Sequence, residues 1–226
     1  MNTALKTISI LIVGFALTIV TGCAKQQIKY SGFLEDYPDF KPGPEGGADW
    51  VYLKENVDFS VYKRVMIDHV VFYFKNDAWY KGIHPDELQE LSRAFHLEMA
   101  YTLRGAGAYP SAAEPAPDVL RIRFAITDVV PSKPNLNAIT AVMPAGLAIS
   151  TIKKAKTGAH TGVGQASMEV ELLDSMTNER IGAVIDTKAA EKSKLGEGLK
   201  KWGHAKDAFK FWAQRLRKWL DEVNGK

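Results

Sequence analysis

The chain has a single cysteine, Cys23, and its surroundings indicate thiol chemistry rather than a disulfide. Lys6 is the only charged side chain before it, and Ile8 to Val20 is a mostly apolar run that contains one serine, one glycine and one threonine. A basic start, an apolar run of about 7–15 residues and small residues before a cut are the parts of a secretory signal. The run is shorter than the roughly 20 apolar residues of a membrane-spanning helix. We therefore predict cleavage between Gly22 and Cys23, with residues 1–22 as a signal peptide.

The four residues Val20-Thr21-Gly22-Cys23 resemble the bacterial lipobox, in which the cysteine thiol receives diacylglycerol and becomes the new N-terminus. The resemblance implies that the amino group is acylated as well. Each buried CH₂ contributes about 0.8 kcal/mol, so more than one acyl chain makes the anchor durable. Simple secretion, with an unrelated cysteine at the end of the signal, is the alternative. We expect a lipid-anchored envelope protein, and Ala24 in place of an aspartate favours the periplasmic face of the outer membrane in a Gram-negative host.

Other residues with catalytic or metal-binding potential do not fall at recognisable spacings. The five histidines include no pair at i+2, i+3 or i+4, the spacings of a local zinc motif. Ser150 to Lys153 matches Ser-x-x-Lys formally but has no partner motif. Gly158 to Gly164 is rich in glycine but lacks the preceding strand and following helix of a phosphate-binding loop. We therefore predict no catalytic residues, no metal and no cofactor.

Acidic side chains on expected strands are the remaining candidates for acid–base chemistry. Glu169 and Glu171 share one face of their strand, because side chains alternate along a strand, and we interpret that face as solvated. A hydrolase of peptidoglycan, lipid or glycan would need Asp68 and Glu169 to converge with a histidine in a cleft. This enzyme is the alternative to a protein without catalytic activity.

The apolar segment 136–152 and the lysines after it are a candidate surface for membrane or anion contact. The segment is interrupted by proline and glycine, too short to span a bilayer, and followed by Lys153, Lys154 and Lys156. It is a buried connection, the favoured interpretation, or a lipid-touching surface, or a hairpin inserted on oligomerisation. A pocket for lipid or a small ligand beneath it would be a third function. Nucleic acid is disfavoured as a partner by the expected compartment.

The elements that would position these residues follow from periodicity. Runs of β-branched, aromatic or alternating residues predict strands at 63–74, 118–130, 164–174 and 180–189, the last two as a hairpin. Apolar spacings of three and four predict helices from Pro85 to Gly105 and from Ala205 to Val223. This mixture predicts an α+β fold with a small mixed or antiparallel sheet and helices packed on one face.

The expected domain organisation is simple. Residues 23–50 form a lipidated N-terminus and tether, because the breaker cluster at 41–47 continues neither a helix nor a central strand and would lift the folded part off the membrane. The aromatic stretch 32–37 is a candidate to pack back on the domain. Residues 51–226 form one domain.

Several stretches together resemble the bacterial lipoprotein family called domain of unknown function 3313. They are Ser31 to Tyr37, Asp118 to Ile122 running into Ala125 to Thr127, Glu169 to Asp174, and Trp202 with the Trp212-Ala213 helix. The resemblance spans nearly the whole chain after the cysteine, and Ser31 to Tyr37 is its most specific motif. It implies an envelope lipoprotein without an assigned activity, and it transfers no catalytic residues. We therefore expect a non-enzymatic binding or assembly module, with a membrane contact through lipid on Cys23 and an envelope protein or a second copy as partner.

Overall fold

The computed structural model describes residues 28–76, 78, 82–131, 164–189 and 201–226. The predictions for the signal peptide, Gly22, Cys23 and Ala24 lie outside these residues, as do those for segment 136–152 and for Lys153, Lys154 and Lys156. No helix in the described ranges is long and apolar enough to cross a bilayer.

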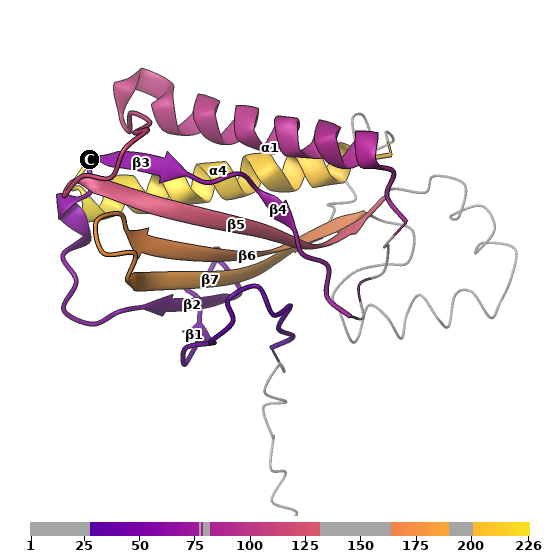
Figure 1. The fold of residues 1–226 in the computed structure, drawn as a ribbon, viewed down its shortest axis with the longest axis horizontal. Coiled ribbons are helices and arrows are strands. Elements are labelled where there is room, and N and C mark those ends of the chain that lie inside the picture. Colours follow the sequence, from indigo (N-terminus) through magenta and orange to yellow (C-terminus); the bar gives the residue numbers. More distant parts are fainter. Residues whose placement is uncertain (1–27, 77, 79–81, 132–163, 190–200) are drawn as a thin grey trace, which may run out of the picture.

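The fold is α+β, as predicted, and is built on a seven-stranded mixed sheet (Figure 1). Its strands are β1 (Lys41–Pro42), β2 (Trp50–Leu53), β3 (Arg64–Ile67), β4 (Val71–Phe72), β5 (Val119–Val130), β6 (Gln165–Asp174) and β7 (Arg180–Ala189). The order is β1-β2-β7-β6-β5-β3, with β4 also beside β5. Strands β3 and β4 run parallel to β5, whereas the other neighbours are antiparallel.

The β6–β7 hairpin forms where the sequence predicts it. The carboxylate of Asp174 accepts hydrogen bonds from the backbone N–H groups of Met176 (3.0 Å) and Thr177 (2.9 Å). Asn178 adopts a left-handed backbone with φ 57°, a conformation that asparagine tolerates better than most residues. Local turn chemistry therefore fixes the register of the two central strands.

The predicted strand at 63–74 is interrupted in the structure. Ile67 pairs with Ile122 and Val71 pairs with Ala125, so this chain advances four residues while β5 advances three. The extra residue breaks the ladder into β3 and β4. A second irregularity lies in β5 near Thr127, whose buried hydroxyl oxygen has no hydrogen-bond partner within the described part of the chain.

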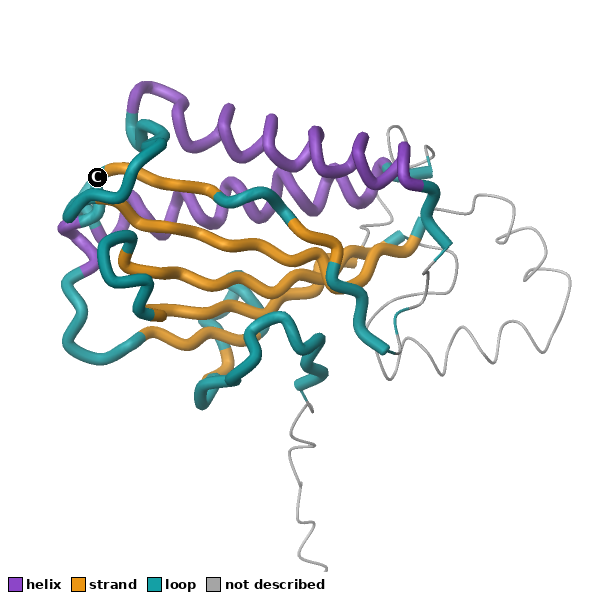
Figure 2. Tube along the Cα trace, in the orientation of Figure 1, coloured by secondary structure: helices purple, strands orange, loops and turns teal. Residues whose placement is uncertain are grey.

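Helices α1 (Pro85–Arg104) and α4 (Gly203–Val223) cover one face of the sheet, as predicted (Figures 1 and 2). The start of α1 is favourable because Pro85 occupies the first turn, and Asp86 and Glu87 lie at the positive end of the helix. Short 3-10 turns, η1 (Phe59–Val61) and η2 (Gly105–Gly107), complete the regular elements. Between helices and sheet lies the main core, where Phe95 of α1 meets Phe124 (4.9 Å between ring centroids) and Phe209 (5.3 Å).

The opposite face of the sheet carries a second, smaller core formed with residues 28–40, hereafter the N-terminal segment. Phe33, Leu34 and Phe40 are buried there against Ala125, Ala183 and Ile185. The breaker cluster after it makes the turn between β1 and β2 instead of a spacer. The folded domain therefore begins by residue 28, earlier than the expected boundary at residue 51, because the aromatic residues of this stretch gain more by burial than by exposure.

Candidate functional site

The charged face is the most distinctive feature of the sheet and consists of Asp68, Arg121, Arg123, Glu169, Glu171 and Arg180. Strand alternation creates it: Ile122 and Phe124 point into the helix-side core, and Arg121 and Arg123 therefore point to the other side. The register places Arg123 directly opposite Glu171 on β6. The sequence alone cannot supply this register, so the pairing was not predicted.

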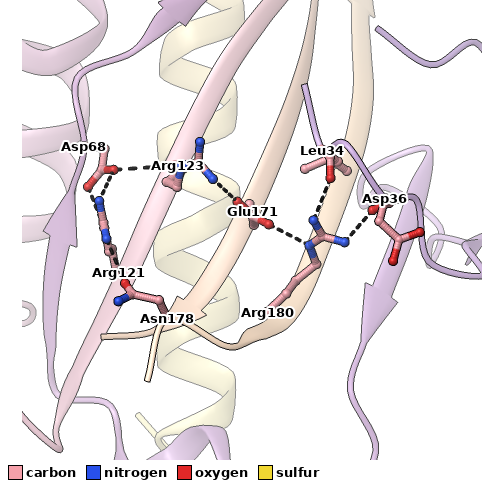
Figure 3. Close-up of polar contacts among 8 residues, drawn as sticks. All are labelled: Leu34, Asp36, Asp68, Arg121, Arg123, Glu171, Asn178 and Arg180. Atoms are coloured by element: carbon pink, nitrogen blue, oxygen red, sulfur yellow. Dashed lines mark hydrogen bonds and ion pairs between the residues drawn. The ribbon is translucent and has the colours of Figure 1, made fainter. Parts of the chain in front are cut away.

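All of these charges except Glu169 form a continuous ladder across the strands, in which an ion pair of 4.0 Å joins Asp68 to Arg123 (Figure 3). Arg121 makes two hydrogen bonds to Asp68, of 3.0 and 2.8 Å. Arg123 bonds one oxygen of Glu171 at 2.6 Å, and Arg180 bonds the other, also at 2.6 Å. The two guanidinium groups thus replace the hydrogen bonds that the buried carboxylate of Glu171 would make with water.

The ladder ends on the backbone of the N-terminal segment. Arg180 donates to the carbonyl oxygens of Leu34 (2.7 Å) and Asp36 (2.5 Å) (Figure 3). The guanidinium of Arg123 lies 5.2 Å from the ring centroid of Phe33, a cation–π distance. The N-terminal segment is therefore held on the sheet by Arg123 and Arg180, the two arginines that also bond Glu171.

Glu169 fastens the segment at a second point. Its side chain is fully buried and accepts hydrogen bonds from the backbone N–H of Ser31 (2.7 Å) and the hydroxyl of Tyr37 (2.7 Å). Burial, followed by the hydrogen bond to Glu169, raises the pKa of Tyr37, so the tyrosine remains a donor at neutral pH. The prediction that Glu169 and Glu171 face solvent is wrong, because the N-terminal segment covers them.

The histidines that the structure describes lie away from this face. His69 follows Asp68 in sequence, but its ring packs against His96 of α1 with centroids 5.5 Å apart. His96 accepts a hydrogen bond from the N–H of Val70 (3.2 Å), and burial, together with the nearby His69, lowers its pKa. Asp68 and Glu169 thus have arginine, tyrosine and backbone partners instead of a histidine. Within the described residues, no group of three or more histidine, cysteine and acidic side chains is placed to hold a metal ion.

A second polar cluster, built on the buried Asp186 and not predicted from the sequence, joins α4 to the sheet. Asp186 accepts hydrogen bonds from the indole N–H of Trp212 (2.7 Å) and the backbone N–H of Asp49 (2.9 Å). Asp49 in turn accepts from the N–H of Thr187 (3.1 Å). Burial is the main cause that raises the pKa of both carboxyls. The spacing of the tryptophans predicts a helix packed on the core, but it does not predict that Trp212 bonds Asp186.

The chain matches a known protein family over most of its length. The family described as "Protein of unknown function (DUF3313)" matches residues 29–216, a range that includes the N-terminal segment, the charged face and most of α4. The chain belongs to DUF3313. This confirms the resemblance seen in the sequence motifs, and Ser31 to Tyr37 of this DUF3313 chain is the stretch fastened to the charged face. No curated protein matches the sequence.

Solved structures resemble the DUF3313 chain only distantly. A PelC dodecamer from Paraburkholderia phytofirmans is 12% identical with a TM-score of 0.41, over 74% of this chain and 96% of that one. A DUF4136 family protein from Bacteroides thetaiotaomicron is 8% identical with a TM-score of 0.35, over 77% and 95%. A putative neuraminyllactose-binding hemagglutinin homolog from Helicobacter pylori is 11% identical with a TM-score of 0.38, over 84% and 95%. These values are too low to carry information on function.

Proposed function

We propose that this DUF3313 chain is a lipid-anchored lipoprotein of the bacterial envelope that acts as a non-enzymatic binding or assembly module on the periplasmic face of the outer membrane. The observation that carries the proposal is the lipobox-like sequence that ends at Cys23 behind a short apolar run. Ile28, five positions later, already packs against the smaller core of the domain, so an anchor at Cys23 would lie next to the fold.

The state of the acids supports a role without catalysis. The hydrolase alternative requires Asp68 and Glu169 to work with a histidine, whereas Asp68 is bonded twice by Arg121 and Glu169 lies sealed beneath Ser31 and Tyr37. A carboxylate whose oxygens already accept hydrogen bonds from the protein is poorly placed to exchange a proton with a substrate. Their contribution is structural, because Glu169 clamps the N-terminal segment and Asp68 holds Arg121 on the sheet.

The outer surface of α1 supports a binding role. Leu97 and Tyr101 are one helical turn apart and expose 64% and 82% of their surface. Arg93 and Arg104 continue the same side of the helix and are exposed. Large apolar side chains exposed together beside arginines are typical of protein contacts. A two-fold pair of α1 helices centred on this stripe would bring Arg93 near Arg104 of the second copy, so a different protein with an acidic and apolar surface fits better than self-association.

The anchor is tested by the intact mass of the purified native protein. The proposal expects a chain that starts at Cys23 and carries diacylglycerol and a further acyl group, and a Cys23→Ser variant that keeps its signal sequence or appears free of the membrane. A chain that starts elsewhere or carries no fatty acid contradicts it.

The binding role is tested with a photocrosslinking amino acid at position 101. A matched control places it at Lys218 of α4, whose side chain is also two-thirds exposed. We expect a discrete adduct from position 101 in intact cells, absent from position 218 and lost in the Arg93→Glu, Arg104→Glu double variant. Adducts that are the same from both positions, or that survive the double charge reversal, contradict a partner at this stripe.

A further inference from the structure

We infer that the sheet face covered by the N-terminal segment lies against the membrane, and that α1 and α4 face away from it. This orientation rests on the proposed lipid on Cys23. Ile28, the first described residue, packs against the smaller core on the sheet face opposite the helices. In Figure 1 the described chain begins beside β1 and β2, at the edge of the sheet far from α1. The anchor therefore enters the domain from one defined side.

The chain between the anchor and the fold is short. Tyr30 is stacked on Tyr37 with 4.0 Å between ring centroids, and Ser31 is bonded to the buried Glu169. Ile28 also packs against the smaller core, so the backbone is held from residue 28 onward. From Cys23 to Ile28 there are five residue steps, which span at most about 18 Å even when fully extended. The domain cannot move farther than this distance from the bilayer surface. The linker between anchor and fold is therefore much shorter than the tether over residues 23–50 that the sequence predicts.

The thickness of the domain limits which face can reach the bilayer. A helix with its side chains is about 10–12 Å across, and packed layers lie about 10 Å apart. The outer surface of α1 is thus separated from the covered face by the sheet and the helix layer, roughly 15 Å, and the N-terminal segment adds a further layer. For α1 to touch the membrane, residues 23–28 would have to be extended over their full length. The covered face can touch the membrane without any such extension.

The side chains around the point of entry suit a lipid interface. Tyr30 and Tyr73 each expose 46% of their surface and flank the segment, with Tyr73 resting 6.3 Å from the ring of Phe33. Tyrosine is enriched at the headgroup level, because its ring is apolar and its hydroxyl finds polar partners there. The segment and β1 also carry Lys29, Lys41 and three acids, so their formal charges nearly cancel. The contact therefore depends on the acyl chains and the tyrosines rather than on anionic lipid.

The orientation has a consequence for the proposed binding role. With the covered face on the bilayer, the exposed stripe of Leu97 and Tyr101 points into the compartment, where a partner can reach it. The two faces of the sheet then have separate tasks, because one carries the anchor and the other carries the helices.

The test uses the full-length lipidated protein in vesicles of phosphatidylethanolamine and phosphatidylglycerol that contain an acceptor-labelled lipid. Because Cys23 is the only cysteine and its thiol is alkylated, a cysteine introduced elsewhere gives a unique site for a donor dye. Glu35→Cys places the dye on the N-terminal segment, Leu97→Cys places it on α1, and Lys218→Cys places it on α4. We expect energy transfer to be at least about threefold more efficient from position 35 than from positions 97 and 218, because transfer falls steeply over the thickness of the domain.

Each result has a definite meaning. Equal transfer from the three positions, or stronger transfer from 97, overturns the orientation. A Tyr30→Ala, Tyr73→Ala variant should still float with the vesicles, but the difference in energy transfer between positions 35 and 97 should become smaller. An unchanged difference would show that the two tyrosines do not contribute to the membrane contact. Failure of the wild-type chain to float with vesicles, together with a mass that lacks fatty acid, refutes the proposed lipoprotein itself and the orientation with it.

Discussion

Replacing Arg180 by methionine tests whether the charged face fastens the N-terminal segment. The guanidinium of Arg180 is the only group that joins Glu171 to the carbonyl oxygens of Leu34 and Asp36 among the described residues. Methionine keeps an unbranched apolar stem and loses every donor. Glu171 retains its bond to Arg123, so the carboxylate is not left without a partner. The variant should therefore fold and release the segment.

The expected magnitude follows from the bonds lost. A hydrogen bond to a charged group contributes about 1.5–3 kcal/mol, and two of them run from Arg180 to the segment. Because the side chain is 22% exposed and water can replace part of this interaction, we expect docking to weaken by about 2–4 kcal/mol. At 1.4 kcal/mol per factor of ten, the segment then opens about 30- to 700-fold more often.

Amide hydrogen exchange measures this opening directly. The N–H of Ser31, which is bonded to Glu169, should lose protection by that factor, while the N–H of Val170 in the central strand β6 should change far less. Arg64→Met is the matched control, because Arg64 also bonds a carboxylate twice, at Asp118, but lies exposed and contributes nothing to the segment. Unchanged protection of Ser31 in the Arg180 variant, or an equal loss throughout β6, would refute the reasoning.

Three further predictions concern the rest of the fold. Gly43→Ala should destabilise the protein by at least about 2 kcal/mol in urea unfolding, because an added Cβ would lie 1.8 Å from the carbonyl oxygen of Ala48, whereas Gly82→Ala, with open space around it, should have no effect. Burial raises the pKa of Asp186 above its usual 3.8, so this carboxyl stays protonated to a higher pH in the folded state than in the unfolded chain. The stability that this protonation contributes is therefore lost as the pH rises through the raised pKa. The Asp186→Asn variant should therefore gain stability relative to the wild type as the pH rises above the usual pKa of 3.8, and a constant difference in urea midpoint would contradict this. Thr127→Val should leave stability unchanged or raise it by up to about 1 kcal/mol in thermal unfolding, because the buried hydroxyl it removes has no partner in the described structure.

The elements that the sequence predicts well are those with a strong local signal. Apolar spacings of three and four predict α1 to within a residue, and they predict α4 from two residues after its observed start at Gly203. Alternation and the turn after Asp174 predict β5, β6 and β7 closely. The short strands β1 and β2 carry no such signal, because β2 forms a strand only by pairing with β7, and β1 only by pairing with β2.

The charged face could be predicted only in part. Period-two alternation correctly puts Glu169 and Glu171 on one side of β6, but it cannot tell whether that side is covered. The cover comes from Ser31 and Tyr37, which are 138 and 132 positions away from Glu169 in sequence. Two aromatic residues in a supposed tether were the only sign of it, and the partners of Arg123 and Arg180 depend on a register that no local pattern specifies.

The place of β2 beside β7 sets an order of events in folding. The contact between Asp49 and Asp186 joins positions 137 apart, and β2 completes the sheet on a strand that is made last. Residues 28–53 therefore wait without a neighbour until nearly all of the chain is available, and such distant pairing slows folding. Until β2 pairs with it, β7 presents a bare edge, which is where strands of separate molecules most readily join. Residues at the start of the folded domain thus close the sheet last and protect this edge from aggregation.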